Sequence, residues 1–194
     1  MEDRYQKLFI YLRAYLHGSK YIKALKAFDF ARRVHTGTRK DGQTPEYQHQ
    51  VEIALYLTTL REVMDEERTI AVALLHDTME DYDGISRDDI VKLTDNEIAD
   101  CCLLLNKNGK KPENYFGDIG NSAIASLVKG ADRIHNVNSM RGVFSPEKQQ
   151  SYLNEIKKHF LPMLKNARNK FPEQTLAYFN EEHMLRSMVN MLKD

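Results

Sequence analysis

The run His76-Asp77-Thr78-Met79-Glu80-Asp81 places one imidazole and three carboxylates close together in the chain. On a helix, His76 would lie one turn from Glu80, and Asp77 one turn from Asp81. The run follows the apolar residues 71–75, and several charged groups are a costly way to end a core helix. A bound metal ion would compensate the carboxylates. A hydrated helix end carrying a few acids is the plainer alternative.

Asp132 is a second carboxylate in an apolar context. It follows Ile124, Leu127 and Val128 at helical spacing and shares a helix face with Asn136. A lone buried carboxylate is expensive, whereas a carboxylate that binds a cation is not. Asp132 is therefore either a ligand or the partner of a neighbouring arginine.

Two more features lie earlier in the chain. His49 stands near the start of a predicted helix, where it is either a ligand or a histidine satisfied within the core. Just before that helix comes Arg39-Lys40-Asp41-Gly42, whose Asp-Gly pair is a turn signal. This loop either contacts a ligand or is a solvated turn.

The elements that must position these side chains are predicted to be helices throughout, because apolar residues recur at helical spacing and no stretch alternates strongly enough for a strand. Thr94 with Glu97 predicts a capping box at the start of one helix, and Asn121 or Ser122 is expected to cap another. Ser145-Pro146 marks a third helix start, and Pro162 is expected to kink or interrupt that helix. The expected helices cover about 8–18, 22–34, 46–60, 66–79, 95–106, 122–140, 146–161 and 173–192, with loops at 36–45 and 106–120.

Length and composition are those of one soluble domain. The chain has 194 residues, 28 basic and 28 acidic side chains and a formal net charge of zero, which argues against general duplex binding. It contains no apolar run long enough for a membrane span and begins with no signal-peptide pattern. The two cysteines, Cys101 and Cys102, are adjacent and thus poorly placed for a disulfide. We expect a reduced, cytoplasmic protein.

In order and rough spacing, these segments resemble the HD-domain phosphohydrolases of the RelA/SpoT homologue superfamily. More narrowly, the chain is similar to the small alarmone hydrolases, the single-domain form that hydrolyses ppGpp in the stringent response. The elements that carry the resemblance are the Arg39–Gly42 loop, Tyr47 with His49, His76-Asp77, Glu80-Asp81, and Ala131-Asp132-Arg133-Ile134-His135-Asn136. It covers about residues 24–165 and implies an all-α fold, a single-domain HD-type helical bundle over 1–194.

The resemblance implies a metal site made by His49, His76, Asp77 and Asp132. It implies Mn²⁺, and such a mixed nitrogen and oxygen set also accepts other divalent transition metals. Glu80 and Asp81 are the expected catalytic carboxylates. We favour Glu80 for handling the proton and Asp81 for orienting water, although their roles could be exchanged.

Arg39, Lys40 and Asn136 are the expected substrate contacts. Lys129, Arg133 and Arg141 are weaker candidates for binding phosphate. The chain departs from the family at Glu46, Gln50 and Asn138, outside the ligand set, so the substrate is less firmly implied than the reaction.

The implied reaction removes the 3′-pyrophosphate of guanosine tetra- or pentaphosphate, (p)ppGpp, and releases pyrophosphate with GDP or GTP. The residues beyond 165 are too few for a synthetase domain, so we expect degradation without synthesis.

Alternative substrates are NADPH and the pyrophosphorylated 3′ end of tRNA. The lysines near 107–111 and the basic residues of 157–168 could face tRNA but are more simply solvated. An alternative of another class is a catalytically silent nucleotide sensor or partner-binding module. The sequence leaves the oligomeric state open.

Overall fold

The computed structural model describes residues 2–192, and within them the chain forms twelve α-helices and no strand. This confirms the predicted all-α class. The helices are α1 (Glu2–Gly18), α2 (Ile22–Val34), α3 (Glu46–Thr58), α4 (Glu66–Leu75), α5 (Thr78–Asp81), α6 (Arg87–Leu93), α7 (Asn96–Leu105), α8 (Pro112–Ile119), α9 (Ala123–Met140), α10 (Pro146–Glu155), α11 (Leu161–Lys170) and α12 (Thr175–Met191). A π-helical turn, Ile156–Phe160, joins α10 to α11, and a 3₁₀ turn, Pro172–Gln174, precedes α12.

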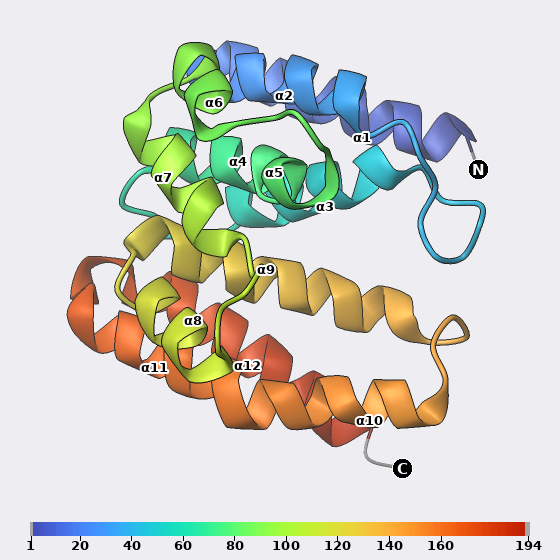
Figure 1. Ribbon diagram of the computed structural model, residues 1–194, viewed down its shortest axis with the longest axis vertical. Coiled ribbons are helices and arrows are strands. Elements are labelled where there is room, and N and C mark those ends of the chain that lie inside the picture. Colours follow the sequence, from blue (N-terminus) through green and yellow to red (C-terminus); the bar gives the residue numbers. More distant parts are fainter. Residues whose placement is uncertain (1, 193–194) are drawn as a thin grey trace.

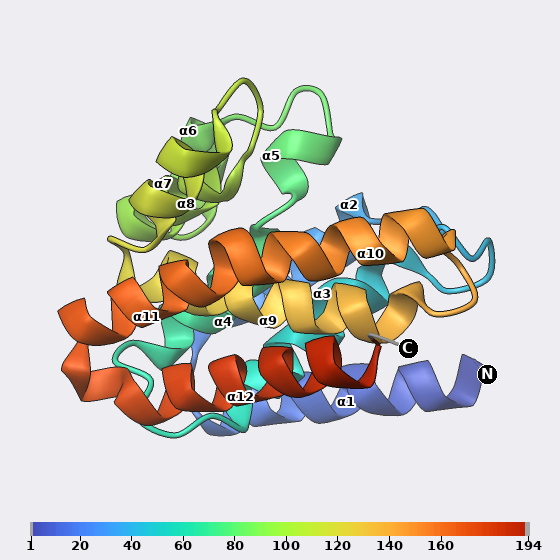
Figure 2. The same cartoon turned by 90° about the horizontal axis from the view of Figure 1, so that it is seen from below.

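Helix α4 lies at the centre of the bundle. Its residues 69–75 are all buried, and it packs against α2, α3, α7 and α9. Helix α9 contacts α3 and α4 on one side and α11 and α12 on the other, so it separates the N-terminal helices from the C-terminal ones (Figures 1 and 2). The two helices therefore hold the segments that carry His76, Asp77 and Asp132 at fixed positions.

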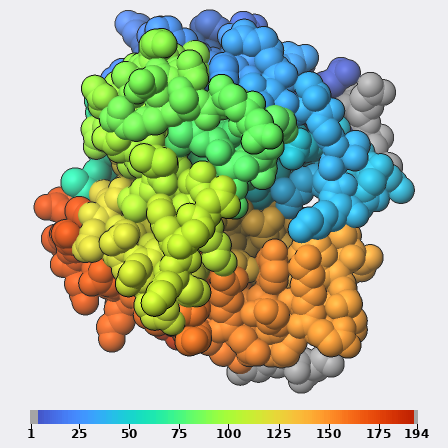
Figure 3. Space-filling view, viewed as in Figure 1, coloured from blue at the N-terminus to red at the C-terminus, as the bar shows by residue number. Residues whose placement is uncertain are grey.

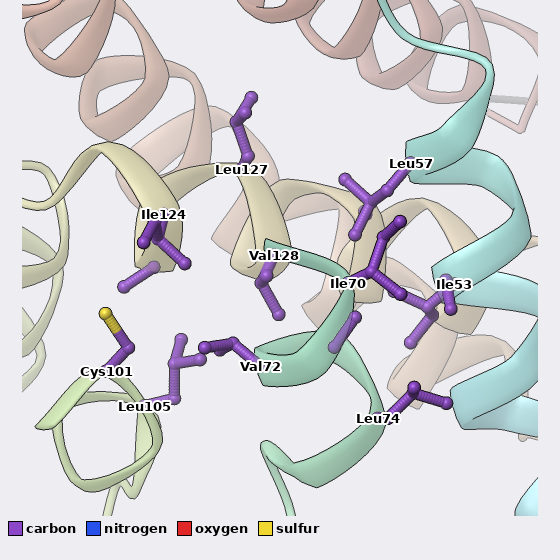
Figure 4. Close-up of a cluster of buried hydrophobic side chains, with 14 of the residues drawn as sticks. Ile53, Leu57, Ile70, Val72, Leu74, Cys101, Leu105, Ile124, Leu127 and Val128 are labelled. Atoms are coloured by element: carbon purple, nitrogen blue, oxygen red, sulfur yellow. The ribbon is translucent and has the colours of Figure 1, made fainter. Parts of the chain in front are cut away.

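The apolar core is built where these helices meet. Figure 4 shows α3, α4, α7 and α9 pointing aliphatic side chains at one another. Residues of this cluster include Ile53, Leu57, Ile70, Val72, Leu74, Cys101, Leu105, Ile124, Leu127 and Val128. Burial of such side chains is the main stabilising contribution to the fold, at roughly 1.5–3 kcal/mol each.

Two of the predicted helix starts are confirmed and one is wrong. Ser122 accepts a hydrogen bond from Ala125 N, and Ser145 caps α10 in the same way. Thr94 does not cap α7; its hydroxyl donates to the Ile90 carbonyl and closes α6 instead. The adjacent Asp95 accepts from Ile98 N at 3.0 Å and is the cap, because aspartate is at least as good an acceptor there as threonine.

Other differences concern short elements. Residues 106–120 were expected to be a loop, but α8 occupies Pro112–Ile119, with proline in its first turn and buried apolar residues on its inner face. The expected helix 66–79 divides into α4 and α5 around His76 and Asp77. Pro162 follows the π-helical turn, and the chain then continues as α11. None of the helices within residues 2–192 combines the length and apolar character that a membrane crossing requires.

An unpartnered carboxyl group lies where α9 meets α12. Glu181 is fully buried, and neither of its carboxyl oxygens has a hydrogen-bond partner among the described residues. The facing position on α9 is Gly130, where a Cβ atom would lie 2.0 Å from Glu181 Oε2. Glycine is therefore the residue that leaves room for this side chain. Burial raises the pKa of Glu181 well above its ordinary value of 4.5.

This burial predicts a specific pH dependence of stability. Below pH 4.5 the Glu181 carboxyl is neutral in both the folded and the unfolded chain, so its burial costs no stability through ionisation. As the pH rises toward the raised folded-state pKa, the carboxyl ionises in the unfolded chain only, and the free energy of unfolding falls. The Glu181→Gln side chain stays neutral at every pH. The difference in free energy of unfolding between this variant and the parent should therefore increase in the variant's favour between pH 5 and 8, by at most about 1.4 kcal/mol per pH unit. Urea denaturation at four pH values measures this difference. The exposed Glu173→Gln is the control, and a constant offset between parent and Glu181→Gln would contradict the prediction.

Candidate metal and substrate site

Three helices bring the predicted ligands together. His49 lies in the first part of α3, His76 and Asp77 follow the last residue of α4, and Asp132 lies in the middle of α9. Since α3, α4 and α9 all pack against one another, side chains that are far apart in sequence converge at their junction.

The four side chains form a tight group. His49 Nε2 lies 3.3 Å from Asp132 Oδ1 and 3.8 Å from Asp77 Oδ2. His76 Nε2 lies 3.0 Å from Asp77 Oδ2 and 4.0 Å from Asp132 Oδ1. One ligand atom from each of His49, His76 and Asp77 falls within 4.8 Å of the others. This separation is short enough for one cation to contact several of them at once.

The donor set also fits a metal ion in its hydrogen bonding. His76 Nδ1 lies 2.8 Å from the Ala73 carbonyl, which only accepts, so Nδ1 carries the proton. Its other nitrogen, Nε2, is buried, faces the carboxylates and has no hydrogen-bond partner among the described residues. A histidine fixed in this way by a backbone carbonyl presents a lone pair to a metal.

The electrostatics of the group require positive charge. Burial alone would raise the pKa of Asp77, but the neighbouring His76 lowers it to about 2. Burial alone would lower the pKa of His76, but the Asp77 carboxylate raises it to about 9. Burial opposes ionisation of Asp132 as well, and Lys129, 3.0 Å away, holds the pKa of that carboxyl well below its usual value. The charges of the ionised Asp77 and Asp132 carboxylates are thus balanced by Lys129 and by a proton on His76, at the position where a cation would bind.

A cavity of about 770 Å³ opens above this group. Figure 3 shows the surface hollowed where the blue segment around residue 40, the green segment around 80 and the orange segment around 150 meet. His49 and Asn136 line its floor, and Asp81 lines its wall. The volume falls within the usual range for sites that bind small molecules.

The Arg39–Gly42 loop lines the cavity as an ordered turn. Asp41 Oδ1 accepts hydrogen bonds from the backbone of Gln43 and Thr44, and Gly42 adopts a φ of 70°, which favours glycine. Arg39 Nη2 donates to Asn136 Oδ1 at 2.9 Å, and Asn136 Nδ2 donates to Asp132 Oδ1. The predicted substrate contacts are therefore joined to a predicted ligand.

The other predicted basic contacts differ in placement. Lys40 lines the cavity, with its Nζ 5.3 Å from the centre of the Phe144 ring. Lys129 is bound to Asp132, and Arg133 lies between the rings of Tyr152 and Phe160, at 4.3 Å from each. Neither Lys129, Arg133 nor the exposed Arg141 lines the cavity. The structure does not place these three as phosphate contacts.

The two predicted catalytic carboxylates point in different directions. Asp81 lines the cavity, and burial, followed by the charges of Asp77 and Glu46, raises its pKa to about 6. Both residues are exposed, but Glu80 does not line the cavity, and its Oε2 accepts a hydrogen bond from Lys107 N at 3.0 Å. The cavity therefore presents Asp81, while Glu80 ties α5 to the segment before α8.

Several cavity residues were not selected from the sequence. Tyr82 donates to Glu46 Oε2 at 2.6 Å and lies 3.2 Å from His35 Nδ1. His135 belongs to a quoted motif but had no assigned role, and it contacts both His49 and Glu52. The spacing of Glu52, three residues after His49, was the available signal, because residues three apart share a helix face.

Comparison with known proteins finds sequences that are similar to most of this chain. A family profile described as HD domain matches residues 27–106. GTP pyrophosphokinase rsh of Brucella melitensis is 29% identical over 174 residues, which are 81% of this chain and 22% of that protein. A probable guanosine-3′,5′-bis(diphosphate) 3′-pyrophosphohydrolase of Synechocystis is 32% identical over 150 residues, 71% of this chain and 19% of the relative. The chain thus spans about a fifth of the length of these relatives.

A solved structure gives the same fold over most of the chain. It is described as a metazoan ortholog of SpoT that hydrolyzes ppGpp and plays a role in starvation responses. The match has a TM-score of 0.67 and 21% identity, and it covers 85% of this chain and 94% of that one. Residues 27–106 thus match an HD domain, and most of the chain is similar in sequence to one segment of these RelA/SpoT-type proteins.

Proposed function

We propose that this protein hydrolyses the 3′-pyrophosphate of (p)ppGpp, releasing pyrophosphate with GDP or GTP. The observation that carries the proposal is the convergence of His49, His76, Asp77 and Asp132, of which His49 lines a cavity that Asp81 and Arg39 also line. Relatives named as guanosine-3′,5′-bis(diphosphate) 3′-pyrophosphohydrolases, from Synechocystis and Aquifex aeolicus, support the choice of substrate.

In this proposal the two histidines and two aspartates hold one divalent transition ion, with Mn²⁺ as the expected metal. The ion supplies Lewis-acid chemistry, which polarises a phosphoryl oxygen and makes a water molecule more acidic. Lys129 keeps Asp132 ionised and oriented through its 3.0 Å contact with Oδ2, leaving Oδ1 directed at the histidines. Asn136 restrains the same Oδ1.

Hydrolysis forms a bond from a water oxygen to the phosphorus next to the ribose and breaks the bond from that phosphorus to the 3′ oxygen. The water must lose a proton, and the 3′ oxygen must gain one. Of the two predicted catalytic carboxylates, Asp81 lines the cavity and Glu80 does not, so we assign this proton handling to Asp81. Glu80 holds α5 in place through its bond to the Lys107 backbone. This assignment gives Asp81 the proton handling that the sequence favoured for Glu80, and it gives Glu80 a structural role instead.

Arg39 and Lys40 supply the positive charge at the rim. Arg39 can turn from Asn136 to form paired hydrogen bonds with a phosphate or to stack on a base. Lys40 offers a point charge beside the Phe144 ring. Both residues belong to one ordered loop, so a bound nucleotide would meet them together.

The first test is a turnover screen with Mn²⁺. We expect release of pyrophosphate from ppGpp and pppGpp, identified by separating the products. NADPH and 3′-pyrophosphorylated tRNA form parallel arms, and a chelated sample is the control. Faster turnover of either alternative would replace the proposed substrate, and binding without turnover of any compound would favour a nucleotide sensor.

The ligand assignment predicts one divalent transition ion per chain. His76→Ala and Asp77→Ala should each abolish stoichiometric binding, because each removes a donor from a set that is preorganised in the core. Elemental analysis and calorimetric titration with Mn²⁺ measure the content and the affinity. His17→Ala, on the exposed end of α1, should bind as the parent does. Parental affinity in both site variants would contradict the ligand set.

The carboxylate assignment predicts unequal effects of two similar substitutions. Asp81→Asn should lower kcat by about 10²–10⁴-fold, the usual worth of positioned acid–base catalysis. Glu80→Gln keeps an oxygen that can accept from Lys107 N and should lower kcat much less. Both variants should retain the metal, which elemental analysis checks. A larger loss for Glu80→Gln would return the proton-handling role to Glu80.

The loop predicts a role for Arg39 in binding. Arg39→Ala should weaken substrate binding by roughly 1–3 kcal/mol, the range for a lost charge-assisted contact, and leave metal content unchanged. Arg39→Lys should restore little if the guanidinium forks or stacks, and much if charge alone matters. Steady-state kinetics provides KM and kcat, with exposed Arg61→Ala as the matched control. Values within about twofold of the parent in Arg39→Ala would remove Arg39 from the site.

A further inference from the structure

We infer that His135 and Glu52 act together as a positioning pair that holds His49 in the one tautomer able to bind a cation. This inference rests on the proposed role of His49 as a metal ligand. Its basis is an unbroken run of hydrogen bonds from a carboxylate, through one imidazole, to the predicted ligand.

The run begins at Glu52, whose two oxygens both have partners. Oε1 accepts from Gln48 Nε2 at 2.7 Å, and Oε2 lies 2.6 Å from His135 Nε2. An ionised carboxylate can only accept hydrogen bonds. The proton shared in the contact between His135 and Glu52 therefore belongs to His135 Nε2, and the Glu52 carboxylate keeps it on that nitrogen.

The second contact joins two histidines. His135 Nδ1 and His49 Nδ1 are 2.8 Å apart, so one nitrogen donates and the other accepts. Glu52 already holds a proton on His135 Nε2, and in a neutral ring His135 Nδ1 then carries a lone pair. With His135 neutral, His49 Nδ1 is the donor, which leaves His49 Nε2 without a proton.

That nitrogen faces the predicted metal position. His49 Nε2 lies 3.3 Å from Asp132 Oδ1 and 3.8 Å from Asp77 Oδ2. In the other tautomer Nε2 would carry the proton and donate it to Asp132, and the lone pair needed for a cation would be absent. The orientation of the Nδ1 hydrogen bond therefore decides whether His49 is a ligand.

The pair also fixes the distance between two helices. Gln48, His49 and Glu52 lie on α3, whereas Asp132 and His135 lie on α9, three residues apart. The hydrogen bonds through His135 thus join the same two helices that supply His49 and Asp132. His135 thus holds the ring of His49 at Nδ1, while His49 Nε2 faces the carboxylates.

Loss of such a supporting partner typically lowers metal affinity 10–100-fold. We expect His135→Leu to show a loss of this size for Zn²⁺, measured by competition with a chelator of known affinity. His135→Asn can place an amide oxygen near the position of Nδ1, so it should recover most of the affinity. Glu52→Gln keeps the shape but can no longer dictate which His135 nitrogen is protonated, so it should fall between the parent and His135→Leu.

A spectroscopic readout separates positioning from general stability. In ¹⁵N-labelled, Zn²⁺-loaded parent, the proton on His49 Nδ1 should be protected from exchange and give a distinct imidazole N–H signal. The signal should persist in His135→Asn and vanish in His135→Leu. His159→Leu removes a histidine that stacks on Phe116, away from the cavity, and should change neither the affinity nor the signal.

The outcomes keep the two proposals distinct. If the parent chain binds no Zn²⁺ or Mn²⁺, the ligand assignment fails, and this inference fails with it. If the parent binds but His135→Leu and Glu52→Gln bind equally well and keep the signal, the positioning role alone is overturned. Neither readout depends on which nucleotide is hydrolysed, so both remain decisive whatever the turnover screen finds.

Discussion

The constraint on which the rest of the structure depends is the placement of two carboxylates, the half-buried Asp77 and the buried Asp132, at the junction of α3, α4 and α9. Removing an ionised carboxylate from water costs several kcal/mol unless it is paired. Here the pairing comes from Lys129 on the same helix as Asp132 and from two imidazoles that face the carboxylates. The helices that carry these groups form the best-buried part of the core, so their spacing is fixed by packing. An anionic centre in a rigid apolar frame favours a cation with several oxygen and nitrogen ligands.

The same constraint explains why the chain breaks at the end of α4. The buried residues of α4 end at His76, where the chain must direct an imidazole and a carboxylate inward rather than add another apolar turn. The short helix α5 then sends Glu80 and Asp81 to different surroundings. Asp81 N donates to the Asp77 carbonyl at 2.9 Å, so the two residues remain one helical turn apart after the break. Asp81 then lines the cavity, while Asp77 belongs to the metal-ligand group.

Much of this arrangement can be predicted from residue types and order, and the failures have physical causes. The spacing of apolar residues gave the helical class and most long helices, since amphipathic periodicity is a local property. Helix α8 was not predicted because its buried aromatic residues, Tyr115 and Phe116, lie in a segment whose glycines, lysines and single proline resemble a loop. The order of the motifs identified the ligand candidates, but the partners of Lys129 and Arg133 depend on tertiary contacts. Glu80 and Asp81 are neighbours in α5 and therefore point in different directions, but which of them meets the cavity depends on how α5 packs, a tertiary property.

Helix α9 joins the floor of the site to its rim. Asp132, His135 and Asn136 share one face of it, and each meets a different part of the site. The amide of Asn136 has one orientation compatible with its partners, because Arg39 only donates and the Asp132 carboxylate only accepts. If Arg39 turned toward a bound nucleotide, Asn136 would still be held by Asp132. The Asn136 amide thus links the substrate-contact residue Arg39 to the predicted ligand Asp132 through two separate hydrogen bonds.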